Sequence, residues 1–144
     1  MLDIRGQPCA YDAPRSELAK KRMPHHFTVD VEEYFHPTTL SRWSPRGRWP
    51  EMRRRSPVIV GRILDLLATH EVKATFFVLG WLADREPDMV TAIARAGHEV
   101  ASHGWDHRLV GEFKPSEFRE DVRRTKSLLE DLIGAPVRGY RAPS

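Results

Sequence analysis

Strand-like and helix-like segments alternate along most of this chain, and that alternation limits the possible fold more than any other feature. Runs of β-branched and aromatic residues predict four strands, at 26–31, 73–79, 98–101 and 137–140. Between them, apolar residues recur at helical spacing in three segments, which begin at Ser56–Pro57, near Pro87 and at Pro115. Ser56 suits the N-cap position of the first of these helices. The pattern predicts a parallel α/β sheet, either open or barrel-like.

Chain length and composition place the chain among globular proteins. Its 144 residues are enough for one domain of ordinary size. Residues 1–25 are polar and lack periodicity, so we expect a leader at 1–25 followed by a domain at 26–144. No apolar run approaches the roughly 18 residues that a membrane span requires. The first residues lack the pattern of a signal peptide, and Cys9 is the only cysteine, so we expect a cytoplasmic protein without disulfides.

Polar residues that could bind a metal ion or take part in catalysis stand at the ends of three of the four predicted strands. They are Asp30, Glu32, Glu33, His103, His107 and Arg141. The carboxyl ends of parallel strands meet at one edge of a sheet, and functional sites of α/β folds gather there. The sequence therefore predicts that carboxylates, two histidines and an arginine converge on a single site.

His103 and His107 have the spacing of a metal-ligand pair. On a helical turn, residues four apart lie on one face, so we expect both imidazoles to reach one ion. Gly104 follows His103, which excludes the glutamate-containing helix motif of many zinc proteases. Two surface histidines in a loop are the alternative interpretation. The other histidines lack such a pattern and are predicted to be structural or solvated: His25, His26, His36, His70 and His98.

The acids at the end of the first predicted strand can divide two tasks between them. Side chains alternate along a strand, so Asp30 and Glu32 point to the same face while Val31 points away. Glu33 is turned aside unless the strand has already ended. One acid of the pair can then bind a metal ion while the other moves a proton.

Three ordered motifs give the chain a family resemblance. They are Thr28–Phe35 (TVDVEEYF), Ser102–His107 (SHGWDH) and Arg138–Pro143 (RGYRAP). Together they resemble the first three motifs of the polysaccharide deacetylase family, the NodB-homology domain of carbohydrate esterase family 4. The first motif is most similar to the branch associated with bacterial exopolysaccharide biosynthesis. The resemblance covers roughly residues 26–144.

This resemblance implies a role for each of the polar residues. Asp30 matches the catalytic base, and Arg141 matches the arginine that orients and charges that base. His103 and His107 match the two histidine ligands of a divalent metal ion, for which zinc is expected although cobalt, nickel or iron also suit such ligands.

The acidic ligand departs from the usual family pattern. Most members have two adjacent aspartates, whereas Val31 stands at the second position here. Strand geometry favours Glu32 as the metal ligand, and Glu33 is the alternative.

The implied activity is metal-dependent hydrolysis of N-acetyl groups, through their C–N bonds, on an exopolysaccharide. The implied fold is a distorted (β/α) barrel of seven or eight units, and barrels of this kind typically need roughly 250 residues. We therefore expect the chain to be the N-terminal half of such a barrel. An incomplete sheet exposes an unpaired edge and an uncovered apolar face, so we expect residues 1–144 to bind metal weakly. The general acid of the family belongs to a later motif, so we also expect little or no turnover.

Segment 42–55 suggests a different class of function. It holds two tryptophans, Trp43 and Trp49, and six arginines against the single acid Glu51. Such a segment can bind sugar rings or polyanions without catalysis, although a solvated loop beside an active site is the simpler interpretation. A hydrolase of small amides with the same fold is a further alternative. No nucleic-acid partner is expected, and the sequence does not indicate an oligomeric state.

Overall fold

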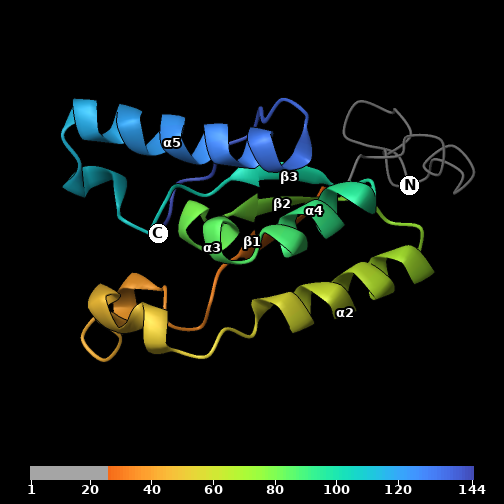
Figure 1. The fold of residues 1–144 in the computed structure, drawn as a ribbon, viewed down its shortest axis with the longest axis horizontal. Helices are drawn as coiled ribbons and strands as arrows, with labels where there is room; N and C mark the ends of the chain where they lie inside the picture. Colours follow the sequence, from red (N-terminus) through yellow and green to blue (C-terminus); the bar gives the residue numbers. More distant parts are fainter. Residues whose placement is uncertain (1–25) are drawn as a thin grey trace, which may run out of the picture.

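A short parallel sheet organises the structure, a computed structural model that describes residues 26–144; the predicted leader at 1–25 lies outside the described residues. The strands are β1 (Phe27–Val31), β2 (Ala74–Val78) and β3 (Glu99–Ser102), and they pair in the order β1-β2-β3. The register sets Asp30 opposite Phe77 and Val78 opposite Ser102. All three strands therefore point the same way and end at the same edge of the sheet (Figure 1).

Helices connect the strands and cover one face of the sheet. The elements between residues 26 and 144 are η2 (Thr38–Leu40), η3 (Arg46–Glu51), α2 (Ser56–Thr69), α3 (Gly80–Arg85), α4 (Pro87–Arg95), η4 (Val110–Glu112) and α5 (Pro115–Ile133). Helix α4 packs between α2 and α5 (Figure 1). In this part of the chain, no helix combines the length and the apolar character that crossing a bilayer demands.

The hydrophobic core lies between the sheet and these helices. Phe76 and Val78 of β2 are fully buried, and they share one cluster with Ile93 of α4 and Leu129 of α5. Truncation of a buried aromatic residue such as Phe76 typically costs 3–5 kcal/mol, about as much as a small domain can lose. The core thus fixes the strand ends from which the polar residues project.

The expected α/β alternation is confirmed, with two corrections to its elements. The predicted strand at 137–140 is wrong: one parallel bridge joins Ser102 to Tyr140, and the Ser102 N–H donates to the carbonyl of Gly139 at 2.9 Å. Helix α3 was not predicted, because its six residues are too few to show helical periodicity. It begins at Gly80, where a Cβ atom would lie 2.5 Å from the Trp105 ring.

Candidate metal centre

Glu32, His103 and His107 come together beyond the carboxyl ends of the strands. One ligand atom from each of these residues lies within 4.8 Å of the other two. The two imidazole rings are 5.5 Å apart between centroids, and both side chains are almost fully buried. The predicted convergence of these three residues is therefore found, and Arg141 and Asp30 lie beside them.

The helical turn expected between the two histidines is wrong. Residues 103–109 follow β3 as a loop, in which Gly104 has φ +76° and His107 has φ +57°. Positive φ is uncommon for a residue other than glycine, so the conformation of His107 has to be held by its surroundings. The loop, rather than helical spacing, turns both imidazoles toward one point.

Two helices hold this histidine loop in place. The first two N–H groups of α3 donate to the carbonyls of Gly104 and Trp105, at 2.9 and 2.8 Å. From α5, the carboxylate of Asp121 accepts a hydrogen bond from the Trp105 N–H at 3.2 Å. Burial raises the pKa of Asp121, while its bond to Trp105 opposes that rise. The loop between the two histidines is thus tied on both sides to the helical layer.

The hydrogen bond of His103 determines which of its nitrogens is free. Its Nδ1 lies 2.9 Å from the backbone carbonyl of Arg141. A carbonyl only accepts hydrogen bonds, so Nδ1 carries the hydrogen and Nε2 keeps its lone pair. Burial lowers the pKa of His103, which favours the neutral ring that binds metal ions. A second partner that orients a histidine in this way is typical of metal ligands.

His107 and Glu32 face each other across the same point. His107 Nε2 lies 3.0 Å from Glu32 Oε2, and the adjoining carboxylate raises the pKa of His107. Despite this short distance, Oε2 is buried without an aligned hydrogen bond to any residue between 26 and 144. On its other side, His107 Nδ1 lies 3.4 Å from Thr38 Oγ1. Two imidazoles that can lose their proton and one carboxylate oxygen without a hydrogen bond are suitable ligands for a divalent cation.

Asp30 and Arg141 form an ion pair next to this cluster. Arg141 Nη1 donates to Asp30 Oδ1 at 2.5 Å, and Nη2 donates to Thr28 Oγ1 at 2.9 Å. The guanidinium also lies 4.0 Å above the ring of Phe77. Asp30 is close enough to His103 to oppose, by its charge, the lowering of that pKa. The pair is partly exposed, with more than a third of the Asp30 side chain open to solvent.

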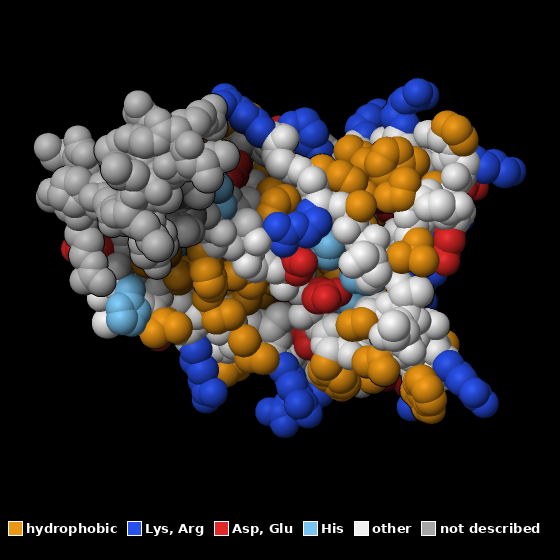
Figure 2. All heavy atoms as spheres, turned by 180° about the vertical axis from the view of Figure 1, so that it is seen from behind, with side chains coloured by type: hydrophobic (Ala, Val, Ile, Leu, Met, Phe, Trp, Pro, Cys, Tyr) orange, Lys and Arg blue, Asp and Glu red, His pale blue; other side chains and the backbone are white. Residues whose placement is uncertain are grey.

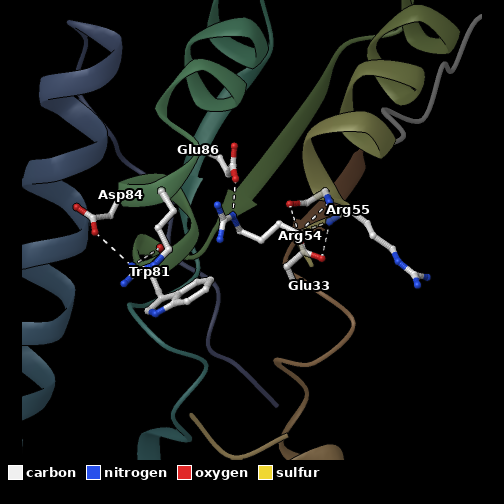
Figure 3. A network of polar contacts seen from close by, with 8 residues as sticks. Glu33, Arg54, Arg55, Trp81, Asp84 and Glu86 are labelled. Carbon is white, nitrogen blue, oxygen red and sulfur yellow. Dashed lines mark hydrogen bonds and ion pairs between the residues drawn. The ribbon is translucent and has the colours of Figure 1, made fainter. Parts of the chain in front are cut away.

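Glu33 does not join the histidine cluster and instead binds the start of α2 (Figure 3). Its carboxylate accepts hydrogen bonds from the N–H groups of Arg55 and Ser56, at 2.8 and 2.9 Å, and from the Ser56 hydroxyl at 2.6 Å. These are the donors that a helix N-terminus leaves unpaired. Ser56 is therefore the first residue of α2 rather than its N-cap, and Glu33 performs the capping.

His36, which the sequence predicted to be structural or solvated, is a buried structural residue next to the site. The ring is 97% buried against Phe35, Trp49 and Trp81. Its Nδ1 accepts the Glu33 N–H at 2.9 Å. Burial, together with the charges of the two neighbouring site histidines, lowers the pKa of His36 to about 3. Its position in the sequence follows no periodic pattern that would have predicted this burial.

The basic segment 42–55 is ordered and partly committed to internal contacts. Arg54 pairs with Glu86 at 2.5 Å (Figure 3), and Arg46 pairs with Asp106 at 3.3 Å. The two tryptophans have opposite environments: Trp49 is 3% exposed, whereas Trp43 is 69% exposed. Trp49 therefore belongs to the core and cannot serve as a surface platform for sugars.

Surface charge is unevenly distributed around the site. Figure 2 shows carboxylates and histidines next to one another near the middle of one face, while many Lys and Arg side chains project from its margins.

A profile of the polysaccharide deacetylase family matches residues 53–144, which is more than half of the chain. The chain belongs to this family. The matched range contains His103, His107 and Arg141, and it begins after Asp30 and Glu32.

Two curated deacetylases illustrate how similar this chain is to other members of the polysaccharide deacetylase family. A peptidoglycan-N-acetylglucosamine deacetylase of Bacillus cereus is 37% identical over 82 residues, which are 57% of this chain and 30% of the relative. A chitooligosaccharide deacetylase of Rhizobium leguminosarum bv. trifolii is 50% identical over 74 residues, which are 51% of this chain and 34% of the relative. The chain thus spans about a third of the length of these two relatives.

The fold is also that of solved family structures. The peptidoglycan deacetylase PdaC from Bacillus subtilis superposes with a TM-score of 0.64 at 24% identity, over 82% of this chain and 48% of that one. At this identity the likeness concerns the fold alone. It agrees with the barrel-type α/β architecture that the motifs predicted.

Proposed function

We propose that this chain carries the metal-binding and base residues of a divalent-metal-dependent deacetylase that hydrolyses N-acetyl groups on a polysaccharide. Family membership and the names of the relatives support deacetylation. The observation that carries the proposal is the convergence of Glu32, His103 and His107, with the Asp30–Arg141 pair beside them. Two histidines and one carboxylate leave coordination positions open for substrate, as catalytic zinc sites do.

Glu32, His103 and His107 would hold the ion, and zinc suits this donor set. A divalent ion bound there supplies a Lewis acid for the acetamide carbonyl and lowers the pKa of water. The protein prepares one of the ligands: the Arg141 carbonyl fixes His103 with its Nε2 lone pair free, and burial favours the neutral form of that ring by lowering its pKa.

Asp30 is the proposed base, and its hydrogen bonding indicates which oxygen acts. Arg141 binds Oδ1, so Oδ2 is the oxygen that takes the proton from the attacking water. The water oxygen bonds to the acetamide carbon, and the C–N bond breaks to release acetate as the amine nitrogen takes a proton from the general acid, which belongs to a later motif of the family. Arg141, held in turn by Thr28 and Phe77, keeps the carboxylate in one orientation.

The proposed substrate is an N-acetylated bacterial exopolysaccharide. This choice depends on the Thr28–Phe35 motif, which resembles that of the exopolysaccharide-associated branch. The relatives named above act, by their names, on peptidoglycan and on chitooligosaccharide, which also contain N-acetylated amino sugars.

Zinc binding and acetate release test this proposal together. We expect the purified chain to bind zinc, and His103→Ala to lose that binding, while the exposed His70→Ala keeps it. Only weak acetate release from N-acetylated oligosaccharides is expected of residues 1–144; it should require zinc and should disappear in Asp30→Asn, which keeps the shape of the base but cannot accept the proton. Zinc binding unchanged in His103→Ala, or acetate release that persists in Asp30→Asn, would overturn the proposal.

A further inference from the structure

The positive charge of this protein is concentrated in one short segment. Segment 42–55 carries six arginines against one glutamate, whereas residues 56–144 hold 12 basic and 13 acidic residues. A concentration of one sign attracts ligands of the opposite sign to that part of the surface. The segment follows β1 and lies beyond the carboxyl ends of the strands (Figure 1).

Four of the six arginines are exposed and form no ion pair with an acid between residues 26 and 144. They are Arg42, Arg48, Arg53 and Arg55. The Arg42 guanidinium lies 5.9 Å from the ring of Trp43, which is the most exposed large hydrophobic residue described. An exposed aromatic ring next to a cation suits a sugar ring that carries a negative group.

The same segment forms one wall of a pocket that reaches the metal centre. The pocket has a volume of about 320 Å³, and its lining includes Arg46 and Trp49 of the segment together with His107 and the acid Glu112. That volume is at the lower end of small-ligand sites, which measure roughly 300–1,000 Å³. Arg46 also pairs with Asp106, the neighbour of His107, so the basic segment is fastened to the histidine loop.

We propose that segment 42–55 binds the anionic groups of the polymer on which the metal centre acts, so that the substrate is an acidic N-acetylated polysaccharide. This inference rests on the proposed function and names the substrate class of the same site. The exposed arginines would bind carboxylate or phosphate substituents, and Trp43 would stack on a sugar ring. The intervening pocket would hold the part of the chain between these contacts and the acetamide.

The limited extent of the basic surface favours a polysaccharide over a nucleic acid. Duplex DNA carries about one negative charge per 1.7 Å, and proteins bind it through basic surfaces that follow its backbone. Here the excess positive charge ends with the segment, and the helices that follow carry a near balance of charges. Among the large hydrophobic side chains of segment 42–55, only that of Trp43 is exposed as a stacking surface.

A matched pair of oligosaccharides tests the inference on the zinc-loaded chain. A hyaluronan hexasaccharide alternates glucuronate with N-acetylglucosamine, whereas chitohexaose contains N-acetylglucosamine alone and is neutral. We expect hyaluronan to bind more tightly at low salt, and the preference to shrink as salt screens the charges. The triple variant Arg42→Gln, Arg48→Gln, Arg53→Gln should weaken hyaluronan binding by roughly tenfold and leave chitohexaose binding unchanged.

A second triple variant controls for net charge. Arg62→Gln, Arg95→Gln, Arg119→Gln removes three exposed arginines from α2, α4 and α5 and should retain the preference for hyaluronan. Equal binding of both sugars, no binding of hyaluronan at low salt, or loss of preference in both triple variants would overturn the inference. So would a DNA oligonucleotide that competes equally well with hyaluronan. Zinc binding separates this failure from that of the proposed function, because the segment variant should bind zinc normally.

Discussion

The backbone carbonyl of Arg141 accepts a hydrogen bond from Nδ1 of His103, at 2.9 Å. The same residue binds Asp30 through its guanidinium, at 2.5 Å. One residue thus orients a proposed metal ligand through its main chain and the proposed base through its side chain. Only the second of these contacts depends on the identity of the side chain.

Replacement of Arg141 should therefore separate metal binding from catalysis. We expect Arg141→Ala to bind zinc within about threefold of the unmodified chain, because the carbonyl that holds His103 remains. Acetate release should fall by roughly tenfold or more, because Asp30 loses the partner that orients it. Zinc titration and an acetate assay measure the two effects, with Arg138→Ala, an exposed arginine nearby, as the control. A loss of zinc binding as large as in His103→Ala would contradict this division.

The two adjacent glutamates should give opposite results. Glu33→Ala should lower the free energy of unfolding by about 1–3 kcal/mol, because three donors at the start of α2 lose their acceptor. Its zinc binding should be retained. Glu32→Ala should abolish zinc binding and change the free energy of unfolding by less than about 0.5 kcal/mol. Urea unfolding and zinc titration of both variants check this prediction, and the reverse result would assign the metal to Glu33.

Gly104 should be essential to the histidine loop. The positive φ at this position would destabilise an alanine by roughly 1–2 kcal/mol, and its Cβ would lie 3.2 Å from Asp121 Oδ2. Gly134 also has positive φ but has no atom within 4 Å of such a Cβ, so Gly134→Ala is the matched control. We expect both variants to be destabilised in urea, and only Gly104→Ala to bind zinc about tenfold more weakly. Equal zinc binding in the two variants would show that crowding at Asp121 is unimportant.

Zinc affinity should fall as the solution becomes acidic. Glu32 raises the pKa of His107, so the proton on that ring competes with the metal at a higher pH than at an ordinary histidine. Burial lowers the pKa of His103, so that ring loses its proton first as pH rises. Competition titrations with a chelator between about pH 8 and pH 6 should show the apparent zinc affinity declining steadily. An affinity that stays constant over this range would exclude His107 as a ligand.

His36 should make folding stability sensitive to acid. Its pKa is about 3 in the folded protein and about 6.5 when unfolded, so below pH 6.5 protons bind preferentially to the unfolded chain. The resulting loss of folding stability begins near pH 6.5 and grows until about pH 3 as the pH falls. Between pH 7 and pH 5 it amounts to about 2 kcal/mol.

Replacement of the ring isolates this contribution. Between pH 7 and pH 5, the free energy of unfolding of His36→Phe in urea should fall by about 2 kcal/mol less than that of the unmodified chain. The comparison uses only this change, so the stability of the variant at pH 7 does not matter. His70→Phe, at an exposed position, should follow the unmodified chain. Parallel pH profiles for His36→Phe and the unmodified chain would contradict the assignment.

The convergence of the site residues could be predicted from the sequence, because strand ends and motif spacing are local properties. Asp30, Glu32 and the two histidines follow strands whose apolar character is visible in the chain, and parallel pairing brings those ends together. The roles proposed for these residues stay predictions, as does the cytoplasmic location. Features that depend on tertiary contacts were not predictable: the burial of His36, the capping of α2 by Glu33, and the shape of the loop at 103–107.

The different contacts of Glu32 and Glu33 make spacing at the end of β1 as important as residue type. One carboxylate faces the histidines and the next holds a helix end, although both residues directly follow the last residue of β1. An inserted residue before Glu32 would move that carboxylate to the helix, and a deletion would bring Glu33 to the histidines. Either change keeps both glutamates in the sequence yet leaves one of the two tasks unfilled. Insertions and deletions in this segment should therefore be rarer among functional variants than substitutions.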